Sequence, residues 1–315
     1  MMKKILIFSI LVILTSGAHA QQESQFTNFM HNFLQLNPAY AGVREVPSFT
    51  LLHRNQWIGF NGAPVSQVLS FNSPFFNKRV GFGFTVFHRT AGITSNWSGT
   101  MAYSYDLRIT KDLSLRLGLQ GSFRYLGVDF SDPDVILRDA DDPSAANGNE
   151  MDRYTGNFGA GMFASYKQFF IGLSVPHLFP NEIGFNQNNL LITAEEKPHF
   201  YAMTGITFPV SDKISLRPTV LAKYVQNAPF DADVNLSVLF GKEVTVGASY
   251  RLGGTGSGES ADLLLFYQLN TKFGAGLAYD FSLGDLSRQN SGSFEAIIRY
   301  DIRSDREDLT NPRFF

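Results

Sequence analysis

The sequence predicts an all-β fold, a transmembrane antiparallel β-barrel of about 14 strands preceded by an N-terminal amphipathic helix or plug segment. The first observation is the composition, because only 17% of the 315 residues are charged while 14% are aromatic and 28 are glycine. The second is the alternation of apolar and polar residues over segments of about ten residues or more, the length of a tilted strand that crosses a bilayer. The third is that no apolar run approaches the ~20 residues of a membrane-spanning helix, which leaves the β-barrel as the membrane class that fits.

The charge and the cysteine content exclude several other classes of protein. The formal net charge of −2 rules out a basic nucleic-acid-binding footprint for the chain as a whole. Since the sequence contains no cysteine, disulfides, thiolate metal sites and a lipid-modified N-terminal cysteine are excluded. The apolar content of 44% is too high for a disordered chain.

Residues 1–20 have the layout of a secretory signal peptide. Two lysines precede an apolar stretch, Ile5–Leu14, and an A-x-A pattern ends at Ala20. The apolar stretch is too short to span a bilayer, so we expect cleavage near Ala20-Gln21. Export together with the barrel pattern predicts that the mature chain resides in the bacterial outer membrane.

Residues 21–45 are predicted to form an amphipathic helix followed by a short segment of sequence NPAYAG. Ser24 can cap the start of the helix, and Asn37-Pro38 ends it. The apolar residues of the helix fall on one face: Phe26, Phe29, Met30, Phe33 and Leu34. Two positions stay open for this helix, one on the membrane surface or against a partner, and one inside the barrel as a plug.

Residues 46–302 are predicted to form the barrel, and residues 303–315 a C-terminal periplasmic tail. The alternation is clearest over 96–125, where two long segments of period two follow one another. An even number of strands is typical of single-chain bacterial barrels. The fourteen expected strands lie near 46–54, 63–73, 79–89, 95–108, 112–126, 154–166, 169–176, 198–209, 213–225, 232–240, 243–251, 261–269, 272–281 and 293–302.

The connections between these strands alternate in length. Those that follow the odd-numbered strands are mostly long, as at 127–153, 177–197, 252–260 and 282–292, whereas those that follow the even-numbered strands are short. Outer-membrane barrels have short periplasmic turns and longer extracellular loops. The parity therefore predicts that the long loops are extracellular.

One face of the predicted strands carries glycine and other small residues, which indicates a lumen that water or a plug must fill. These residues are Gly159, Gly161, Gly172, Ser174, Thr245, Gly247, Ser249, Gly274, Gly276 and Ala278. The alternation also predicts that Asp106, Arg116 and Arg124 face the lumen. Charged residues commonly line a polar barrel interior, so their presence does not indicate a catalytic site. We therefore expect no enzymatic activity and no cofactor.

The sequence contains no motif for nucleotide binding or nucleophilic catalysis. The glycine-rich run at 254–258 is a flexible hairpin loop, because no Gly-Lys-Ser/Thr follows it. The loop 127–153 is rich in aspartate, and Asp139, Asp141 and Asp142 are weak candidates for calcium ligands. This loop lacks the EF-hand spacing, and a solvated loop that faces outward is the simpler interpretation.

Several short motifs lie outside the alternating pattern. They are Asn37-Pro38-Ala39-Tyr40-Ala41-Gly42, Arg54-Asn55-Gln56-Trp57, Gly62-Ala63-Pro64 and the closing Asn311-Pro312-Arg313-Phe314-Phe315. With these motifs the mature chain, 21–315, resembles the PorP/SprF family of outer-membrane proteins from Bacteroidetes. The combination of NPAYAG with RNQW is the specific part of the resemblance.

The resemblance implies a component or accessory of the type IX secretion and gliding machinery. Its implied partners are outer-membrane lipid, type IX secretion components or a large secreted adhesin, and a periplasmic peptidoglycan-linked protein, but no nucleic acid. A barrel of this size is too narrow for a folded adhesin, so we expect an anchor or adaptor and not a protein-conducting pore. The alternative is a plugged porin or a transporter for small or hydrophobic solutes.

Seven residues are candidates for docking a partner or the plug: Asn37, Pro38, Tyr40, Gly42, Arg54, Gln56 and Trp57. Tyrosine and tryptophan are enriched at interaction centres, and an arginine can bind a carboxylate through two hydrogen bonds. A second interpretation carries equal weight. In it, these residues only fasten the N-terminal segment inside the barrel.

Overall fold

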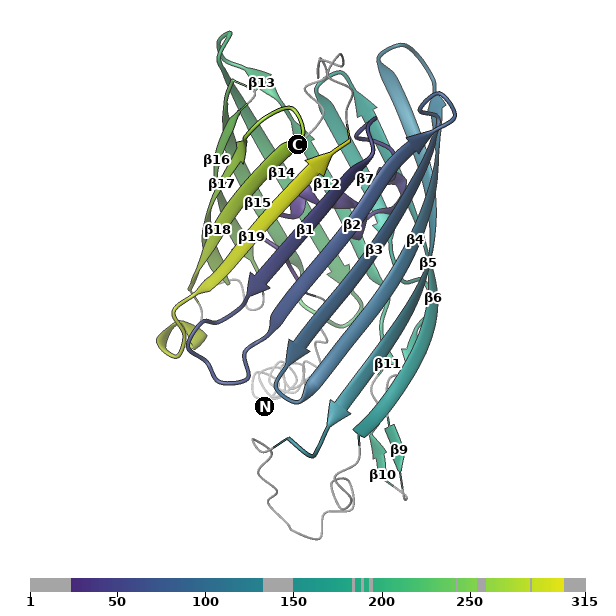
Figure 1. Cartoon of the computed structure of the whole chain (residues 1–315), viewed down its shortest axis with the longest axis vertical. Coiled ribbons are helices and arrows are strands. Elements are labelled where there is room, and N and C mark those ends of the chain that lie inside the picture. The colour runs from purple at the N-terminus through teal and green to yellow at the C-terminus, as the bar shows by residue number, and fades with distance from the viewer. Residues whose placement is uncertain are drawn as a thin grey trace, which may run out of the picture.

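The computed structural model describes residues 24–132, 150–182, 185–187, 190–192, 195–241, 243–253, 259–283 and 285–302. These residues form a closed antiparallel barrel in which each wall strand pairs with the next along the chain and β1 pairs with β19 (Figure 1). The wall strands are β1 (Ser48–Asn55), β2 (Val65–Phe75), β3 (Val80–Ala91), β4 (Thr94–Arg108), β5 (Leu113–Asp129), β6 (Glu150–Tyr166), β7 (Phe169–Val175), β12 (His199–Ile206), β13 (Phe208–Pro209), β14 (Ile214–Val225), β15 (Asp231–Phe240), β16 (Val244–Leu252), β17 (Ser260–Gln268), β18 (Phe273–Ser282) and β19 (Ser293–Asp301).

The prediction of a fourteen-stranded barrel is confirmed. Both β12 and β13 pair with β14, so the two segments make one wall strand that is interrupted at Thr207. The largest difference at a strand end is in β6, which begins at Glu150 because the β5–β6 hairpin extends to the pair Asp129 and Glu150. Residues 177–197 contain four short strands that form two separate ribbons: β8 (Asn181–Glu182), β9 (Phe185–Gln187), β10 (Leu190–Ile192) and β11 (Glu195–Glu196).

The two ends of the barrel differ in the length of their connections. The short turns lie at the top of Figure 1 together with the end of β19, and the longer connections lie at the bottom with the short helix η4 (Asp285–Arg288). We call these the short-turn end and the long-loop end. Because outer-membrane barrels have short periplasmic turns, we expect the short-turn end to face the periplasm.

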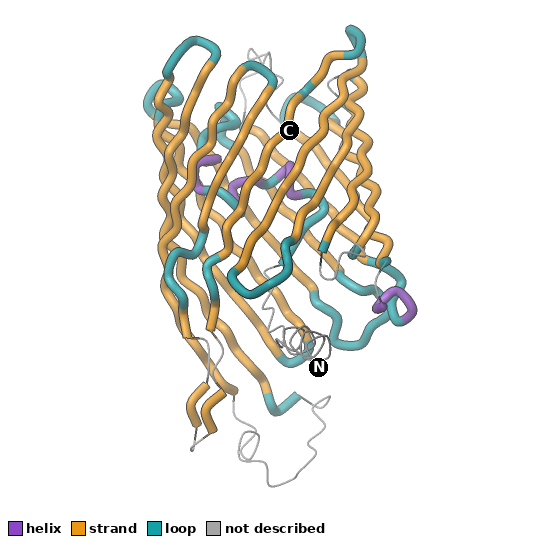
Figure 2. The backbone as a smooth tube through the Cα atoms, turned by 180° about the vertical axis from the view of Figure 1, so that it is seen from behind, coloured by secondary structure: helices purple, strands orange, loops and turns teal. Residues whose placement is uncertain are grey.

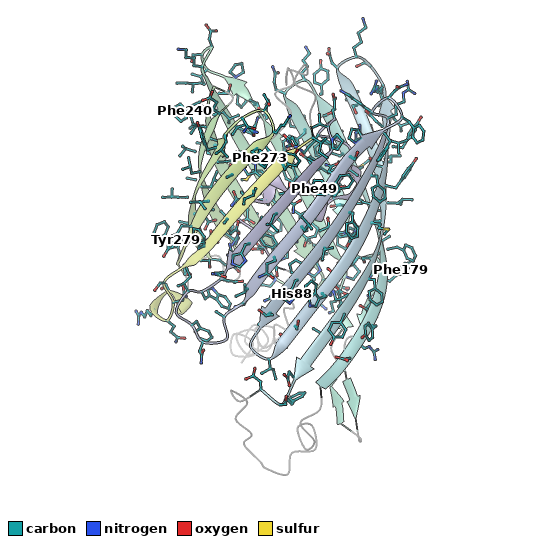
Figure 3. The ribbon with its side chains drawn as sticks, viewed as in Figure 1. Phe49, His88, Phe179, Phe240, Phe273 and Tyr279 are labelled. Atoms are coloured by element: carbon teal, nitrogen blue, oxygen red, sulfur yellow. The ribbon has the colours of Figure 1, made fainter. Side chains whose placement is uncertain are left out.

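The predicted inward and outward faces of the wall are also observed. Leu119 is 66% exposed, whereas its neighbour Gln120 is 5% exposed, because successive side chains point to opposite sides of the sheet. The outer wall carries apolar and aromatic side chains, among them Phe49, Phe240 and Phe273 toward the short-turn end and Phe179 and Tyr279 toward the long-loop end (Figure 3). Aromatic residues near both ends of the wall are typical of the two membrane interfaces.

The N-terminal residues form three short 3₁₀ helices, and the prediction of a single amphipathic helix is wrong. These helices are η1 (Phe29–His31), η2 (Phe33–Gln35) and η3 (Pro38–Tyr40). Polar residues such as Thr27, Asn28 and Asn32 are buried along with the apolar ones, so these residues do not divide into a buried apolar face and an exposed polar face. The carboxylate of Glu295 in the barrel wall accepts hydrogen bonds from the backbone N–H groups of Thr27 and Asn28, which a continuous helix would otherwise leave without a partner in its first turn.

We call residues 24–46 the luminal segment, because its buried residues contact the inner wall of the barrel (Figure 2). Its main hydrophobic cluster includes Phe33, which is fully buried, and Met203 of β12. No helix among the described residues is long and apolar enough to cross a membrane.

Candidate functional site

Small residues form a continuous row across the inner wall from β3 to β7. Strand register places Gly81 beside Ser104, Ser104 beside Gly118, and Gly118 beside Gly161. Ser174 of β7 is paired with Gly161 and completes the row. We call these five residues the small-residue row. Because none of them has a large side chain, another stretch of backbone can approach the wall closely here.

The NPAYAG residues of the luminal segment lie on this row. A methyl group added at Gly118 would overlap the backbone of Ala39, and one added at Gly161 would overlap the side-chain amide of Asn37. At the other end of the row, Gly42 has φ +72°, and a Cβ atom built on it would lie 2.7 Å from Gly81 Cα. Glycine adopts this left-handed conformation without the steric cost of a Cβ atom. The fit between segment and wall therefore depends on glycine on both sides.

Hydrogen bonds fasten the same stretch to the wall. Asn37 Nδ2 donates to the carbonyl oxygen of Met162 at 3.0 Å, while Asn37 Oδ1 accepts from the backbone N–H of Ala39 at 2.9 Å. The hydroxyl of Ser104 donates to the carbonyl of Ala41 at 2.6 Å. The hydroxyl of Ser174 donates to the carbonyl of Leu36 at 2.7 Å. These wall groups therefore satisfy backbone atoms of a segment that is cut off from solvent.

Aromatic rings pack beside the row. The Tyr40 ring meets Phe33 at a centroid distance of 5.4 Å and Phe163 at 5.5 Å, both in edge-on geometry. Phe163 and Phe170 stack with centroids 5.4 Å apart. Such pairs contribute ~0.5–1.5 kcal/mol each beyond the area that they bury.

A second set of contacts holds the start of the luminal segment nearer the long-loop end. Glu295 accepts hydrogen bonds from the backbone N–H groups of Thr27 and Asn28, at 2.6 and 2.9 Å. Arg54 Nη1 lies 2.5 Å from Glu295 Oε1 and 2.6 Å from Asp280 Oδ2. All three charged side chains are nearly inaccessible to solvent, with exposures of 4%, 0% and 2%. Removal of one charged partner from such a buried cluster lowers the stability of the fold, because the remaining charges are then buried and unpaired.

His31 and Arg44 make further contacts inside the barrel. The His31 ring stacks on Phe266 with centroids 4.3 Å apart. His31 belongs to the luminal segment and not to a membrane-crossing strand, and burial followed by repulsion from Arg299 lowers its pKa well below the usual range. Arg44 Nη2 lies 3.0 Å from both carboxylate oxygens of Asp301 at the end of β19. The neutral imidazole and the paired guanidinium are both compatible with burial.

The structure divides the seven predicted docking residues into three groups. Asn37, Pro38, Tyr40 and Gly42 are buried against the small-residue row and its aromatic neighbours. Arg54 is buried in the cluster with Glu295 and Asp280. The remaining two, Gln56 and Trp57, lie beyond the end of β1 at the long-loop end and are half-buried.

Sequence reasoning identified Gly161 and Ser174 as small residues of the lumen, but it missed the acidic wall residues that receive the luminal segment. Glu295, Asp280 and Asp301 have the inward phase of the predicted strands, so the alternation could have marked them as buried carboxylates. The calcium candidates Asp139, Asp141 and Asp142 lie outside the described residues. Within the described part of the chain, no group of three or more metal-ligating side chains is placed to hold an ion.

Comparison with known proteins gives one family match and several structural matches. The model of the family described as "Type IX secretion system membrane protein PorP/SprF" matches residues 18–300. No curated protein matches the chain.

The solved structures that resemble this barrel share little sequence with it. The CymD monoaromatic hydrocarbon channel has a TM-score of 0.53 at 13% identity, over 92% of this chain and 96% of that one. The TodX deltaS2S3 mutant monoaromatic hydrocarbon channel has a TM-score of 0.51 at 12% identity, over 85% and 93%. The toluene transporter TbuX of Ralstonia pickettii has a TM-score of 0.50 at 11% identity, over 86% and 92%. At these identities the likeness shows the outer-membrane barrel fold alone.

Proposed function

Since the chain belongs to the PorP/SprF family of type IX secretion system membrane proteins, we propose that it is an outer-membrane anchor or adaptor for export or surface attachment of a partner protein. Family membership and the barrel fold support a location in the outer membrane, and the family is one of type IX secretion system membrane proteins. The partners that we propose are components of the type IX and gliding machinery, a large secreted adhesin, and a periplasmic peptidoglycan-linked protein.

The position of the luminal segment is the observation that supports an anchor over a conduit. Residues of this segment are bonded to β2, β4, β5, β6, β7, β18 and β19. A polypeptide that passed through the lumen would have to displace these contacts. Burial of one large apolar side chain stabilises by roughly 1.5–3 kcal/mol, and the segment buries Phe26, Phe29, Met30, Phe33 and Leu34.

The width of the barrel supports the same choice. Barrel diameter grows with strand number, and even 16–18-stranded porins leave only an aqueous channel. A barrel of fourteen wall strands is narrower still. A folded surface protein would therefore be held at the barrel and carried across the membrane by another component.

The long-loop end offers aromatic residues for contact with a surface partner. Trp57 is half-buried, and Ile58 and Phe60 in the same loop are 39% and 45% exposed. Tryptophan at such positions often dominates the energy of an interface. Arg54, by contrast, is buried in the wall cluster, so we assign it to fastening the luminal segment and Trp57 to partner contact.

The test is a tagged pull-down from detergent-solubilised outer membranes, with mass spectrometry of the proteins that co-purify. We expect type IX secretion components or a large surface protein in the wild-type sample. Trp57→Ala should reduce that recovery and surface display of the partner while leaving the heat-modifiable gel shift of the barrel intact. The matched control is Phe76→Ala, which removes an 82% exposed aromatic residue at the opposite end. Normal recovery and display in Trp57→Ala would contradict the docking role of this residue.

The alternative is a plugged porin or a channel for hydrophobic solutes. Two observations favour considering it: the fold shared with hydrocarbon channels, and an apolar groove of about 520 Å³ in the wall beside Met162, Leu173 and Phe200. The two functions separate in a deletion strain. Loss of a surface protein supports the anchor, whereas loss of solute uptake with normal secretion supports the channel.

A further inference from the structure

The short-turn end of the barrel contains a cavity of about 660 Å³, which we call the vestibule. Its rim includes Lys78 in the β2–β3 turn, Lys111 in the β4–β5 turn and Gln168 in the β6–β7 turn. Its inner boundary includes Val43 of the luminal segment and Phe163 of β6. The vestibule therefore opens toward the periplasm and ends at the docked luminal segment. Its volume lies within the ~300–1,000 Å³ of ligand-binding pockets.

The charge of the vestibule is strongly biased toward cations. Five cationic residues line it against two carboxylates: Lys78, Arg108, Lys111, Arg116 and Arg217 against Glu45 and Asp106. Both carboxylates are already paired, Glu45 with Lys78 at 3.3 Å, and Asp106 with Arg116 at 3.3 Å and with Arg108 at 3.6 Å, which leaves the cations in excess. Lys111 is exposed to solvent in the β4–β5 turn. The cavity thus has positive charge to offer to a ligand.

The cations stand on opposite sides of the vestibule. Lys78, Arg108, Lys111 and Arg116 belong to β2–β5 and their turns, whereas Arg217 belongs to β14. In the closed wall, β6, β7 and β12 separate β5 from β14. A single small anion at one point cannot reach both sides, but an extended chain with several carboxylates can. Arg116 and Arg217 are held in place by burial, at 5% and 3% exposure, so they would lose little freedom on binding.

Apolar surface lies between these charges. Phe163 and Phe170 stack on each other and both line the vestibule. Arg116 is held beside them by the carbonyl of Ala41 at 3.2 Å and that of Lys78 at 2.8 Å. An apolar side chain of a ligand could pack on the two rings while carboxylates on either side meet the cations.

We propose that the vestibule binds an extended acidic peptide segment, with an apolar residue at its centre, of a periplasmic partner protein. This inference rests on the proposed function in taking the ligand to be part of a partner. Binding would be electrostatic at the rim, so it would weaken with salt, because a Debye length of about 10 Å at 0.1 M shrinks as ionic strength rises. It would leave the lumen behind the luminal segment untouched.

The experiment measures fluorescence anisotropy of a fluorescein-labelled peptide of glutamates around one phenylalanine, with purified full-length barrel in detergent. We expect saturable binding that is lost between about 0.1 and about 0.5 M NaCl. The same peptide with glutamine in place of glutamate should not bind. The variant Arg108→Glu with Lys111→Glu should weaken binding by about tenfold or more, since like charges then face each other.

The matched control is Lys213→Glu with Lys272→Glu, which makes the same charge change in two other turns at the same end of the barrel. It should bind the peptide as the wild type does. Equal weakening by both double variants, absence of binding, or displacement by free glutamate as effective as by unlabelled peptide would overturn the proposal. The heat-modifiable gel shift shows whether each variant is folded. If the variant Arg108→Glu with Lys111→Glu does not fold, the single variant Lys111→Glu is tested in its place.

The peptide-binding test and the pull-down test different proposals, and either one can give a negative result while the other is positive. If the pull-down finds secretion partners but the peptide does not bind, the vestibule proposal is wrong and the anchor function stands. If the peptide binds but no secretion partner is recovered, the acidic-peptide site stands and the anchor function fails.

Discussion

The side-chain amide of Asn37 lies against the backbone of Gly161, so close that a methyl group on Gly161 would overlap Asn37 Oδ1. The same amide group donates to the carbonyl of Met162 in the next position of β6. Asn37 is fully buried, and Pro38 follows it into η3. One wall glycine thus sets how closely the luminal segment can approach the barrel.

Gly161→Val should release the luminal segment without breaking the barrel wall. A β-branched side chain suits a strand, but it would occupy the space of the Asn37 amide. We expect protease cleavage within 24–46 and a higher conductance in planar bilayers, while the gel shift of the barrel persists. The control is Gly156→Val on the outer face of β6, where an added Cβ meets nothing closer than 3.8 Å. Open-porin conductance in the wild type would show that the segment does not plug the lumen.

Asn37→Asp should weaken docking more than its small change in shape suggests. The aspartate still accepts from Ala39 N–H, but it cannot donate to the carbonyls of Met162 and Leu173. A carboxylate beside two carbonyl oxygens is repelled, and unpaired buried polar groups cost ~1–3 kcal/mol each. Protease protection of the luminal segment measures the effect. If Asn37→Asp is as well protected as the wild type, the amide donor is not what holds the segment.

The barrel wall could be predicted from sequence because its cause is local. Lipid on one side and a polar lumen on the other force a two-residue period, and a one-residue slip would reverse every side chain. The inward positions of Arg116 and Gln120 and the outward position of Leu119 follow from that period alone. The start of β6 was less predictable, because a hairpin can extend past the membrane without lipid contact to maintain the alternation.

The luminal segment could not be predicted in the same way. Phe26, Phe29 and Phe33 have helical spacing, which normally indicates one buried face. Inside a closed barrel every face is buried, and the partner of the Thr27 N–H group is Glu295, which lies 268 residues further along the chain. The small-residue row likewise cannot be recognised until the register of strands β3–β7 is known. Glycine at 159, 161 and 172 indicated space for water or a plug, but not which of the two fills it.

Arg54→Ala should lower the stability of the folded barrel by ~3–5 kcal/mol, the range for breaking a buried ion pair. The substitution leaves Glu295 and Asp280 buried without their guanidinium partner. The urea midpoint of tryptophan fluorescence measures this loss. Lys78→Ala is the control, because the Lys78–Glu45 pair is 44% and 42% exposed and such pairs contribute about 0–1 kcal/mol. Equal midpoints for the two variants would contradict the buried-pair assignment.

Leu119→Arg should reduce the amount of folded barrel far more than Gln120→Arg. Leu119 faces lipid with 66% exposure, and an arginine near the bilayer midplane costs ~2–4 kcal/mol. At position 120 the side chain faces the lumen, where Gln120 Nε2 already donates to the carbonyl of Pro176 at 3.0 Å. Folding into lipid vesicles, followed by the gel shift, gives the comparison. Similar yields for both variants would mean that the assigned phase of β5 is reversed.

The sidedness of the barrel can be tested with single cysteines, because the chain has none of its own. Gln226 is exposed in the connection between β14 and β15 at the long-loop end, and Lys213 is exposed in the turn before β14 at the short-turn end. On intact cells, Gln226→Cys should react with a membrane-impermeant maleimide, whereas Lys213→Cys should react only after the outer membrane is opened. One strand, β14, connects the two sites, so equal labelling after lysis serves as the internal control for reactivity. The opposite pattern would place the vestibule outside the cell and would move the proposed acidic partner from the periplasm to the cell surface.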